Sequence, residues 1–377
     1  MRALAGMLAL SILACGRREQ PPLGATDLVG DQQCLSCHDS KGTYPATAHH
    51  LTSRLADSSS IAGSFEEGKD VLRTSNPYLH FRMESDSGAF YQSAVVGMAS
   101  DTTVTSERFD IVIGSNRKGQ SYLYWRNDLL FQLPVSYWTE LNAWVNSPGY
   151  QDGVLNFSRP VTPRCLECHA TWFVSRPDSA AVNRYDRSNF ILAITCEKCH
   201  GPGREHVERR RSWASRLLGS AIVNPAGLPR TRQLEGCGLC HGGVGEQNAP
   251  AFSHVPGRPL DESLQLSLSA PGGAIDVHGN QVALLARSRC FQASSTMTCS
   301  TCHDVHQPQR NAAGFSARCL NCHQPEACGL FPERGVEIAE NCVDCHMPEL
   351  TSSTVISSRE GREVQPRIRT HWIRTYD

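Results

Sequence analysis

The sequence predicts a mostly α protein with extensive loops and one inserted region of β-hairpins. Two features lead to this fold class. Seven Cys-x-x-Cys-His motifs run along the 377 residues, and the six beyond residue 164 lie among short helical and Gly/Pro-rich loop patterns. The first motif begins 131 residues before the second, and alternating apolar runs typical of antiparallel strands fill this interval. We therefore expect β structure between the first two motifs.

The composition is that of a folded chain with few aromatic side chains for its hydrophobic core. The chain is 40% hydrophobic and 19% charged, and its formal charge of -1 gives no basic excess that would indicate binding of nucleic acid or an anionic membrane surface. Only 7% of the residues are aromatic, which makes a thin core for this length. A bound group with a flat apolar surface would supply the missing core.

The N-terminus predicts export. Met1 and Arg2 precede an apolar run at 3–14 that is too short to span a bilayer but suits a signal peptide. The run ends in Cys15, as in a bacterial lipobox, so we expect a lipoprotein in the periplasm or at the outer membrane or cell surface; the alternative is an ordinary cleaved signal peptide with an incidental cysteine. Residues 1–15 form this segment, and 16–30 form a linker.

Cysteine spacing decides the class of cofactor. Two thiols separated by two residues can each add to a vinyl group of a haem, and the adjacent imidazole then binds the iron. A zinc site does not require a histidine after every second cysteine, and a redox dithiol is needed once rather than seven times. Seven covalent haem c groups are expected, with thioethers at Cys34, Cys37, Cys165, Cys168, Cys196, Cys199, Cys237, Cys240, Cys299, Cys302, Cys319, Cys322, Cys342 and Cys345. The proximal iron ligands are His38, His169, His200, His241, His303, His323 and His346.

Two further cysteines, Cys290 and Cys328, could form a disulfide or be two buried free thiols, and the sequence does not decide between these alternatives.

Eight histidines remain for seven distal iron positions. Bis-His ligation is common where haems relay electrons, because it keeps the iron low-spin and closed. His206 and His306 closely follow motifs and are expected to bind a neighbouring haem rather than their own. The distal candidates are His49, His206, His306, His371, His278 and His254. His80 lies in a strand pattern and is interpreted as structural, and His50 as a neighbour of the true ligand.

The β region is expected from four apolar runs that turn signals interrupt, at 78–83, 109–113, 121–126 and 129–135. Motif density then divides the chain into a first-haem part with the β-rich insertion at 31–164 and a six-haem cytochrome part at 165–377.

These features resemble the multihaem cytochromes related to tetrahaem cytochrome c-554, and larger seven-haem bacterial members in particular. The resemblance covers most of 30–377 and is carried by Thr47-Ala48-His49, 132–134 through 147–150, Cys196 to Gly203, Cys299 to His306, and Cys342 to Pro348. It implies a multihaem cytochrome fold, closely packed haems, and distal roles for His49, His206, His306 and His371.

Electron transfer through mostly bis-His haems is therefore the expected function, with redox proteins as donor and acceptor. One alternative is an oxidoreductase with one open-site haem that acts on nitrite, hydroxylamine or a sulfur oxyanion. A second is a subunit of a cytochrome filament, so an oligomer is possible. No catalytic residue is assigned, because every motif ends in His, whereas some catalytic relatives carry a Lys at one haem.

Overall fold

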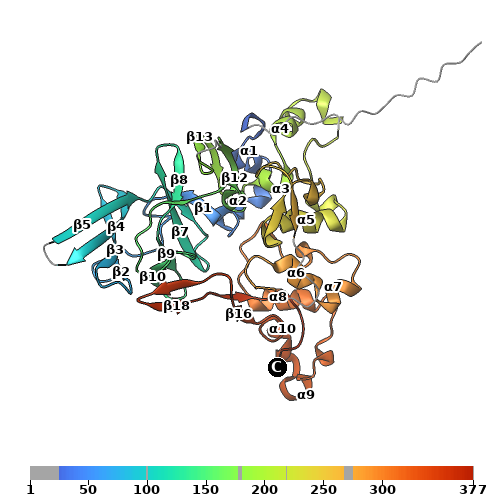
Figure 1. Ribbon diagram of the computed structural model, residues 1–377. Coiled ribbons are helices and arrows are strands. Elements are labelled where there is room, and N and C mark those ends of the chain that lie inside the picture. Colours follow the sequence, from blue (N-terminus) through green and yellow to red (C-terminus); the bar gives the residue numbers. More distant parts are fainter. Residues whose placement is uncertain (1–24, 99–100, 177–180, 218, 267–274, 377) are drawn as a thin grey trace, which may run out of the picture.

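The computed structural model describes residues 25–98, 101–176, 181–217, 219–266 and 275–376 (Figure 1). The expected signal peptide and its Cys15 lie outside these residues. In the described part of the chain, helices are too short or too polar to cross a membrane.

The secondary structure is about 28% helix and 28% strand, so the prediction of a mostly α fold is wrong. The α-helices are α1 (Asp31–Leu35), α2 (Pro163–Glu167), α3 (Cys196–His200), α4 (Arg204–Arg211), α5 (Arg230–His241), α6 (Gln281–Ala286), α7 (Arg289–Ala293), α8 (Ala312–Cys319), α9 (Phe331–Arg334) and α10 (Cys342–His346). Most of them are one or two turns, because they serve to present the motifs rather than to build a helical core.

Strands occur on both sides of the second motif. Between the first two motifs lie β1 (Ser53–Leu55), β2 (Val71–Arg73), β3 (Leu79–Asp86), β4 (Ala89–Met98), β5 (Asp101–Arg108), β6 (Ile111–Ile113), β7 (Gly119–Arg126), β8 (Leu129–Gln132), β9 (Val135–Trp138), β10 (Ala143–Asn146) and β11 (Arg159–Pro160). The later strands are β12 (Ala170–Ser175), β13 (Tyr185–Leu192), β14 (Gly245–Gln247), β15 (Leu264–Leu266), β16 (Glu349–Thr351), β17 (Ser357–Arg359), β18 (Arg362–Val364) and β19 (Arg367–Arg369).

The later strands explain the error. β12 and β13 pair antiparallel and carry aromatic and branched residues such as Thr171, Trp172, Phe173 and Phe190, which suit a pleated sheet. Four short hairpin strands near the C-terminus pair as β16 with β19 and β17 with β18. Sequence reasoning placed strands only before the second motif and therefore missed these.

Two sheets form the β region at the left of Figure 1. The four-stranded sheet has the order β2-β3-β4-β5, and its strands pair antiparallel. The seven-stranded sheet has the path β1-β6-β7-β8-β11, with β9 pairing both β7 and β10. Along β3 the buried residues Leu79, Phe81 and Met83 alternate with more exposed ones, so one face of that strand packs into a core.

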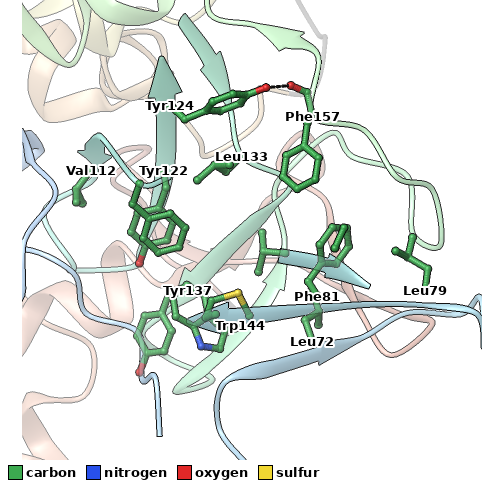
Figure 2. Close-up of a cluster of buried hydrophobic side chains, with 14 residues drawn as sticks. Leu72, Leu79, Phe81, Val112, Tyr122, Tyr124, Leu133, Tyr137, Trp144 and Phe157 are labelled. Atoms are coloured by element: carbon green, nitrogen blue, oxygen red, sulfur yellow. Dashed lines mark hydrogen bonds between the residues drawn. The ribbon is translucent and has the colours of Figure 1, made fainter. Parts of the chain in front are cut away.

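The core of the β region is aromatic (Figure 2). Phe109 stacks on Tyr122 with ring centres 4.5 Å apart, and Trp144 packs edge-on against Tyr137. The Tyr124 hydroxyl donates to the Phe157 carbonyl and so has a partner despite burial. The few aromatic residues of the chain are thus concentrated here, away from most of the motifs.

A second apolar cluster joins the β region to the second motif. Leu166, between the two cysteines of that motif, is buried with Ile111, Leu123 and Leu130 of the seven-stranded sheet. At the other end of the chain, the β17–β18 hairpin reaches β10, where the Asn146 amide donates to the Ser358 hydroxyl at 2.8 Å (Figure 1). Both contacts fix the β region against the cytochrome part.

We expect Phe81→Ala to destabilise the protein by about 3–5 kcal/mol, because it leaves a cavity in the aromatic core. Phe81 is 1% exposed. Val104→Ala on β5, where the side chain is 56% exposed, is the matched control and should change the free energy of unfolding by less than about 0.5 kcal/mol. Urea unfolding followed by tryptophan fluorescence measures both, and equal effects of the two changes would contradict this account of the core.

Candidate haem-binding site

All seven Cys-x-x-Cys-His segments fold as helical turns or at the ends of helices. The third and seventh motifs are α3 and α10 themselves, and the fourth ends α5. At the sixth motif, the amides of Cys322 and His323 both donate to the Cys319 carbonyl just after α8. Positions i, i+3 and i+4 of a helical turn lie on one face, so each motif presents its two thiols and its imidazole to the same side.

The motifs surround one continuous cavity of about 4740 Å³. Both cysteines and the histidine of every motif line it. A pocket for one drug-sized ligand is roughly 300–1,000 Å³, so this space is several times larger than a site for one small molecule. The six distal candidates also line the cavity, whereas His50 and His80 do not.

Four motif histidines face a histidine from outside the motifs. The ring centres are 6.4 Å apart for His38 and His206, 6.1 Å for His241 and His49, 6.1 Å for His200 and His306, and 6.1 Å for His303 and His371. Each of these histidine–histidine contacts joins one motif histidine to one distal candidate. The four distal candidates are the ones that the resemblance implies.

This spacing suits one metal ion between each pair. An imidazole nitrogen binds a metal at about 2 Å and the ring centre lies about 1 Å behind it, so two rings on opposite sides are about 6 Å apart. His206 and His306 face the histidines of other motifs, as expected from their positions. These residues fit a bis-His haem iron, which is closed to other ligands and supports one-electron exchange.

Three motif histidines have other surroundings. His169 Nδ1 is 3.0 Å from the Thr52 hydroxyl, and burial together with the nearby His278 and His241 lowers the pKa of His169. His346 Nδ1 lies 3.0 Å from the Arg374 carbonyl. A hydrogen bond at Nδ1 fixes the tautomer and leaves Nε2 for a metal. Neither His254 nor His278 faces a motif histidine at the spacing of the four pairs in the described structure.

His50 and His80, which were not expected to be distal ligands, have other neighbours. His50 Nε2 lies 3.0 Å from an Asp31 carboxylate oxygen. His80 is on β3, opposite Arg73 and Val95 in the sheet. Neither His50 nor His80 is among the residues that line the cavity.

Burial keeps three of the cavity histidines neutral. Desolvation lowers the pKa of His49, His169 and His371 to about 4 each. Neighbouring histidines lower these pKa values further, because two imidazolium charges would repel. At neutral pH the imidazoles are therefore in the unprotonated form that binds a metal.

Thiols of different motifs touch and give the order of the motifs in space. Cys34 of the first motif lies next to Cys196 of the third, Cys168 of the second lies next to Cys240 of the fourth, and Cys237 of the fourth lies next to Cys299 of the fifth. The Cys342 amide donates to Ser316 of α8 at 2.9 Å, which joins the sixth and seventh motifs. Phe315 of α8 packs on His303 of the fifth motif with ring centres 5.2 Å apart.

Two carboxylates join the first motif to the third. Glu197, inside the third motif, accepts from the amides of Val29 and Gly30 at 2.9 Å and of Gly203 at 2.8 Å. Asp31, beside the first motif, accepts from the Cys196 amide at 2.8 Å. These bonds tie the first and third motifs together independently of any cofactor.

The cavity lining is strongly basic although the chain is nearly neutral. Thirteen Lys or Arg residues line it against three Asp or Glu. Arg117 and Arg310 lie close enough to repel, and burial together with this repulsion lowers the pKa of Arg117. Each haem carries two propionates, so anionic edges of several haems would balance this charge. Sequence reasoning missed the basic lining, because its members come from distant segments.

The remaining sulfur groups argue for haem rather than zinc or disulfides. Cys290 and Cys328 are half-buried in the cavity wall and are not joined to each other by a disulfide in the described structure. Within the described residues, no cluster of three or more Cys, His, Asp or Glu side chains is arranged to hold a metal ion directly. The seven motifs therefore fit covalent haem c and do not group into zinc sites.

Asp276 positions His278. Its carboxylate accepts from the His278 amide at 2.8 Å and from the hydroxyls of Ser352, Ser353 and Thr354 at 2.9 Å each. Burial raises the pKa of Asp276, but these hydrogen bonds outweigh burial and hold the pKa below its ordinary value of 3.8. The carboxylate thereby joins the His278 loop to the segment before β17.

We expect Asp276→Asn to destabilise the protein at pH 7 by about 1–2 kcal/mol, because the charged acceptor is lost. A depressed pKa stabilises the fold above the unfolded value and loses that effect as the pH falls through the folded value. The difference between variant and wild type should therefore be steady from pH 7 to about pH 5 and shrink as the pH falls below the ordinary value of 3.8. Denaturant unfolding at several pH values measures it, and a constant difference would show that the ionised carboxylate is not responsible.

Two comparisons with known proteins found a similarity. Residues 151–201 match the family model described as cytochrome c554 and c-prime. The solved structure of the outer cell wall cytochrome OcwA shares the fold with a TM-score of 0.57 and 17% sequence identity, over 92% of this chain and 80% of that one. No curated protein sequence matches significantly. The match and the shared fold support the resemblance drawn from the motifs.

Proposed function

We propose that this chain, which the family match and the shared fold support as a multihaem c-type cytochrome, binds seven covalent haems and passes electrons along them. Electron transfer by c-type haem is the part that the comparisons support. The number of haems and their ligands are our inference from seven motifs around one cavity. The four facing histidine pairs carry the proposal, because each gives one iron two axial nitrogens.

The contacts between motifs support a continuous path. First and third, second and fourth, and fourth and fifth motifs touch through their thiols, and α8 and α10 continue to the sixth and seventh. Cys199 of the third motif also lies near Cys237 of the fourth. The second motif branches from this line beside the β region. We propose that residues 31–164 hold the first haem and the β-rich insertion, and that residues 165–377 form a six-haem cytochrome part.

The N-terminal segment and the charge of the haem propionates support a proposal for the cellular location and for the redox partners. OcwA is named an outer cell wall cytochrome, and the N-terminal segment of this chain has the pattern of a signal peptide with a lipobox. We propose a periplasmic or cell-surface position with attachment through Cys15. Haem propionates would make the holoprotein more acidic than the sequence, which favours redox partners with basic docking faces.

A haem count tests the proposal directly. The pyridine hemochrome assay on the purified holoprotein, combined with intact mass, should give seven haems per chain. Cys237→Ser with Cys240→Ser should lower the count to six, because the fourth motif then has no thiol for a vinyl group. The double change Cys290→Ser with Cys328→Ser is the matched control and should leave seven. A wild-type count below seven would contradict the proposal.

The charge near the fifth motif offers a second test. Arg117 acts electrostatically on His303, and a nearby cation favours the reduced iron. Arg117→Gln should lower the midpoint potential of one haem by on the order of tens of millivolts. Spectroelectrochemical titration resolves the shift, and Arg362→Gln on β18, outside the cavity lining, is the control. An unchanged titration curve would show that Arg117 faces no haem.

A further inference from the structure

The helix α4 and the turn that follows it carry a surface that the haem cavity does not explain. We propose that α4, Trp213 and Leu217 form a lipid face, which binds an anionic membrane surface beside the anchor at Cys15. The two apolar side chains enter the headgroup region, and arginines of α4 bind lipid phosphates. This inference rests on the proposed attachment through Cys15, and it adds the orientation of the protein on the membrane.

Two exposed apolar side chains carry the inference. Leu217, Val244 and Trp213 are 93%, 89% and 86% exposed, more than any other large apolar side chain among the described residues. Val244 lines the large cavity, so bound haem would cover it. Trp213 and Leu217 do not line the cavity, so the cofactors leave both in water. A partner from outside the chain is therefore needed to bury them.

The N-terminal chain enters the fold beside this surface. The guanidinium of Arg204, the first residue of α4, donates to the Thr26 carbonyl. Ten residues, 16–25, separate Thr26 from Cys15 in the sequence. A fully extended chain spans at most about 3.6 Å per residue, so Thr26 lies within about 40 Å of the anchor. The anchor therefore keeps α4 within reach of the lipid surface.

The charge of α4 suits anionic lipid although the whole chain is nearly neutral. The charged residues of the helix are four arginines and two glutamates: Arg204, Glu205, Glu208, Arg209, Arg210 and Arg211. Glu205 pairs with Arg209, and Arg204, Arg210 and Arg211 are exposed. Arginine binds phosphate through two parallel N–H groups, and its long stem covers apolar surface. Arginines next to exposed Trp and Leu are typical of helices that lie in a membrane interface.

Other exposed apolar side chains lie away from the anchored end. Met98 on β4 and Val104 on β5 are 62% and 56% exposed. These two strands lie at the left edge of Figure 1, whereas α4 lies at its top. Met98 and Val104 therefore provide a control pair of exposed apolar residues that are not part of the lipid face.

The lipid face gives the relay a direction. His206 of α4 faces His38 of the first motif, with ring centres 6.4 Å apart, so the first haem lies directly behind this face. The helix α9, between the sixth and seventh motifs, lies at the opposite end of the molecule from α4 (Figure 1). A donor in the membrane therefore meets the first haem, and the later motifs point away from the membrane.

Co-sedimentation of the holoprotein with vesicles tests the inference. Cys15→Ser removes the proposed acyl chains, so binding of this variant reports the protein surface alone. The probes are vesicles of phosphatidylcholine with roughly one third phosphatidylglycerol, and vesicles of phosphatidylcholine alone. Haem absorbance measures the bound fraction. We expect binding to the anionic vesicles to be at least about tenfold tighter at low salt, and high salt to remove most of this difference.

Substitutions in the Cys15→Ser background locate the surface. Trp213→Ser with Leu217→Ser should weaken binding to the anionic vesicles on the order of 10- to 100-fold, because two apolar side chains no longer leave water. Met98→Ser with Val104→Ser is the matched control and should leave binding unchanged. Equal losses in the two double variants, or no binding of the Cys15→Ser protein to anionic vesicles, would overturn the inference.

Hydrogen exchange of the lipidated wild type is a second measurement, and it needs no variant. The amides of 212–217 should exchange more slowly when the holoprotein is anchored in anionic vesicles than in neutral ones. Identical exchange on both kinds of vesicle would show that the anchored protein does not rest on this face.

The outcomes separate this inference from the proposed function. An acylated, seven-haem wild type whose Cys15→Ser form ignores anionic vesicles would contradict only the lipid face. A wild type without acyl chains would contradict the anchor and with it the orientation. Self-association of the holoprotein that Trp213→Ser with Leu217→Ser abolishes would show that a second copy covers the surface, and this would also overturn the inference.

Discussion

The fold depends on covalent attachment of a large flat cofactor to a single turn of helix. Two cysteines and a histidine at i, i+3 and i+4 share one face, so a five-residue segment can orient a whole haem. Short helices then suffice, because the cofactors fill the space between them. Because so little of the chain fills the space between the motifs, all seven of them line one cavity of about 4740 Å³.

Distal histidines interlock the motifs. His49 follows the first motif and faces the fourth, His206 follows the third and faces the first, and His306 follows the fifth and faces the third. Each haem would thus join two segments far apart in sequence. Loss of one haem is expected to loosen a neighbour as well as its own motif. The β region has an ordinary aromatic core and meets this assembly through Leu166 and the β17–β18 hairpin.

Sequence reasoning can address constraints that act within a short segment, and it misses those that act between distant segments. Motif spacing is set by bond lengths, so haem attachment could be predicted without a structure. The four facing histidines could be ranked because they follow motifs or turns that resemble a known family. The fold class was wrong, because strands beyond the second motif were missed; β16, for example, has only three residues and pairs with β19 across the β17–β18 hairpin. The basic lining depends on tertiary proximity, which no window of sequence contains.

Iron-edge anomalous diffraction from crystals of the holoprotein tests the central claim most directly, because it places each metal without reference to the fold. The account predicts seven iron peaks inside the cavity. Four of them should lie between the paired histidine rings, including one between His38 and His206. An occupied motif whose iron lies away from its facing histidine, or a facing pair with no iron between its rings, would contradict it.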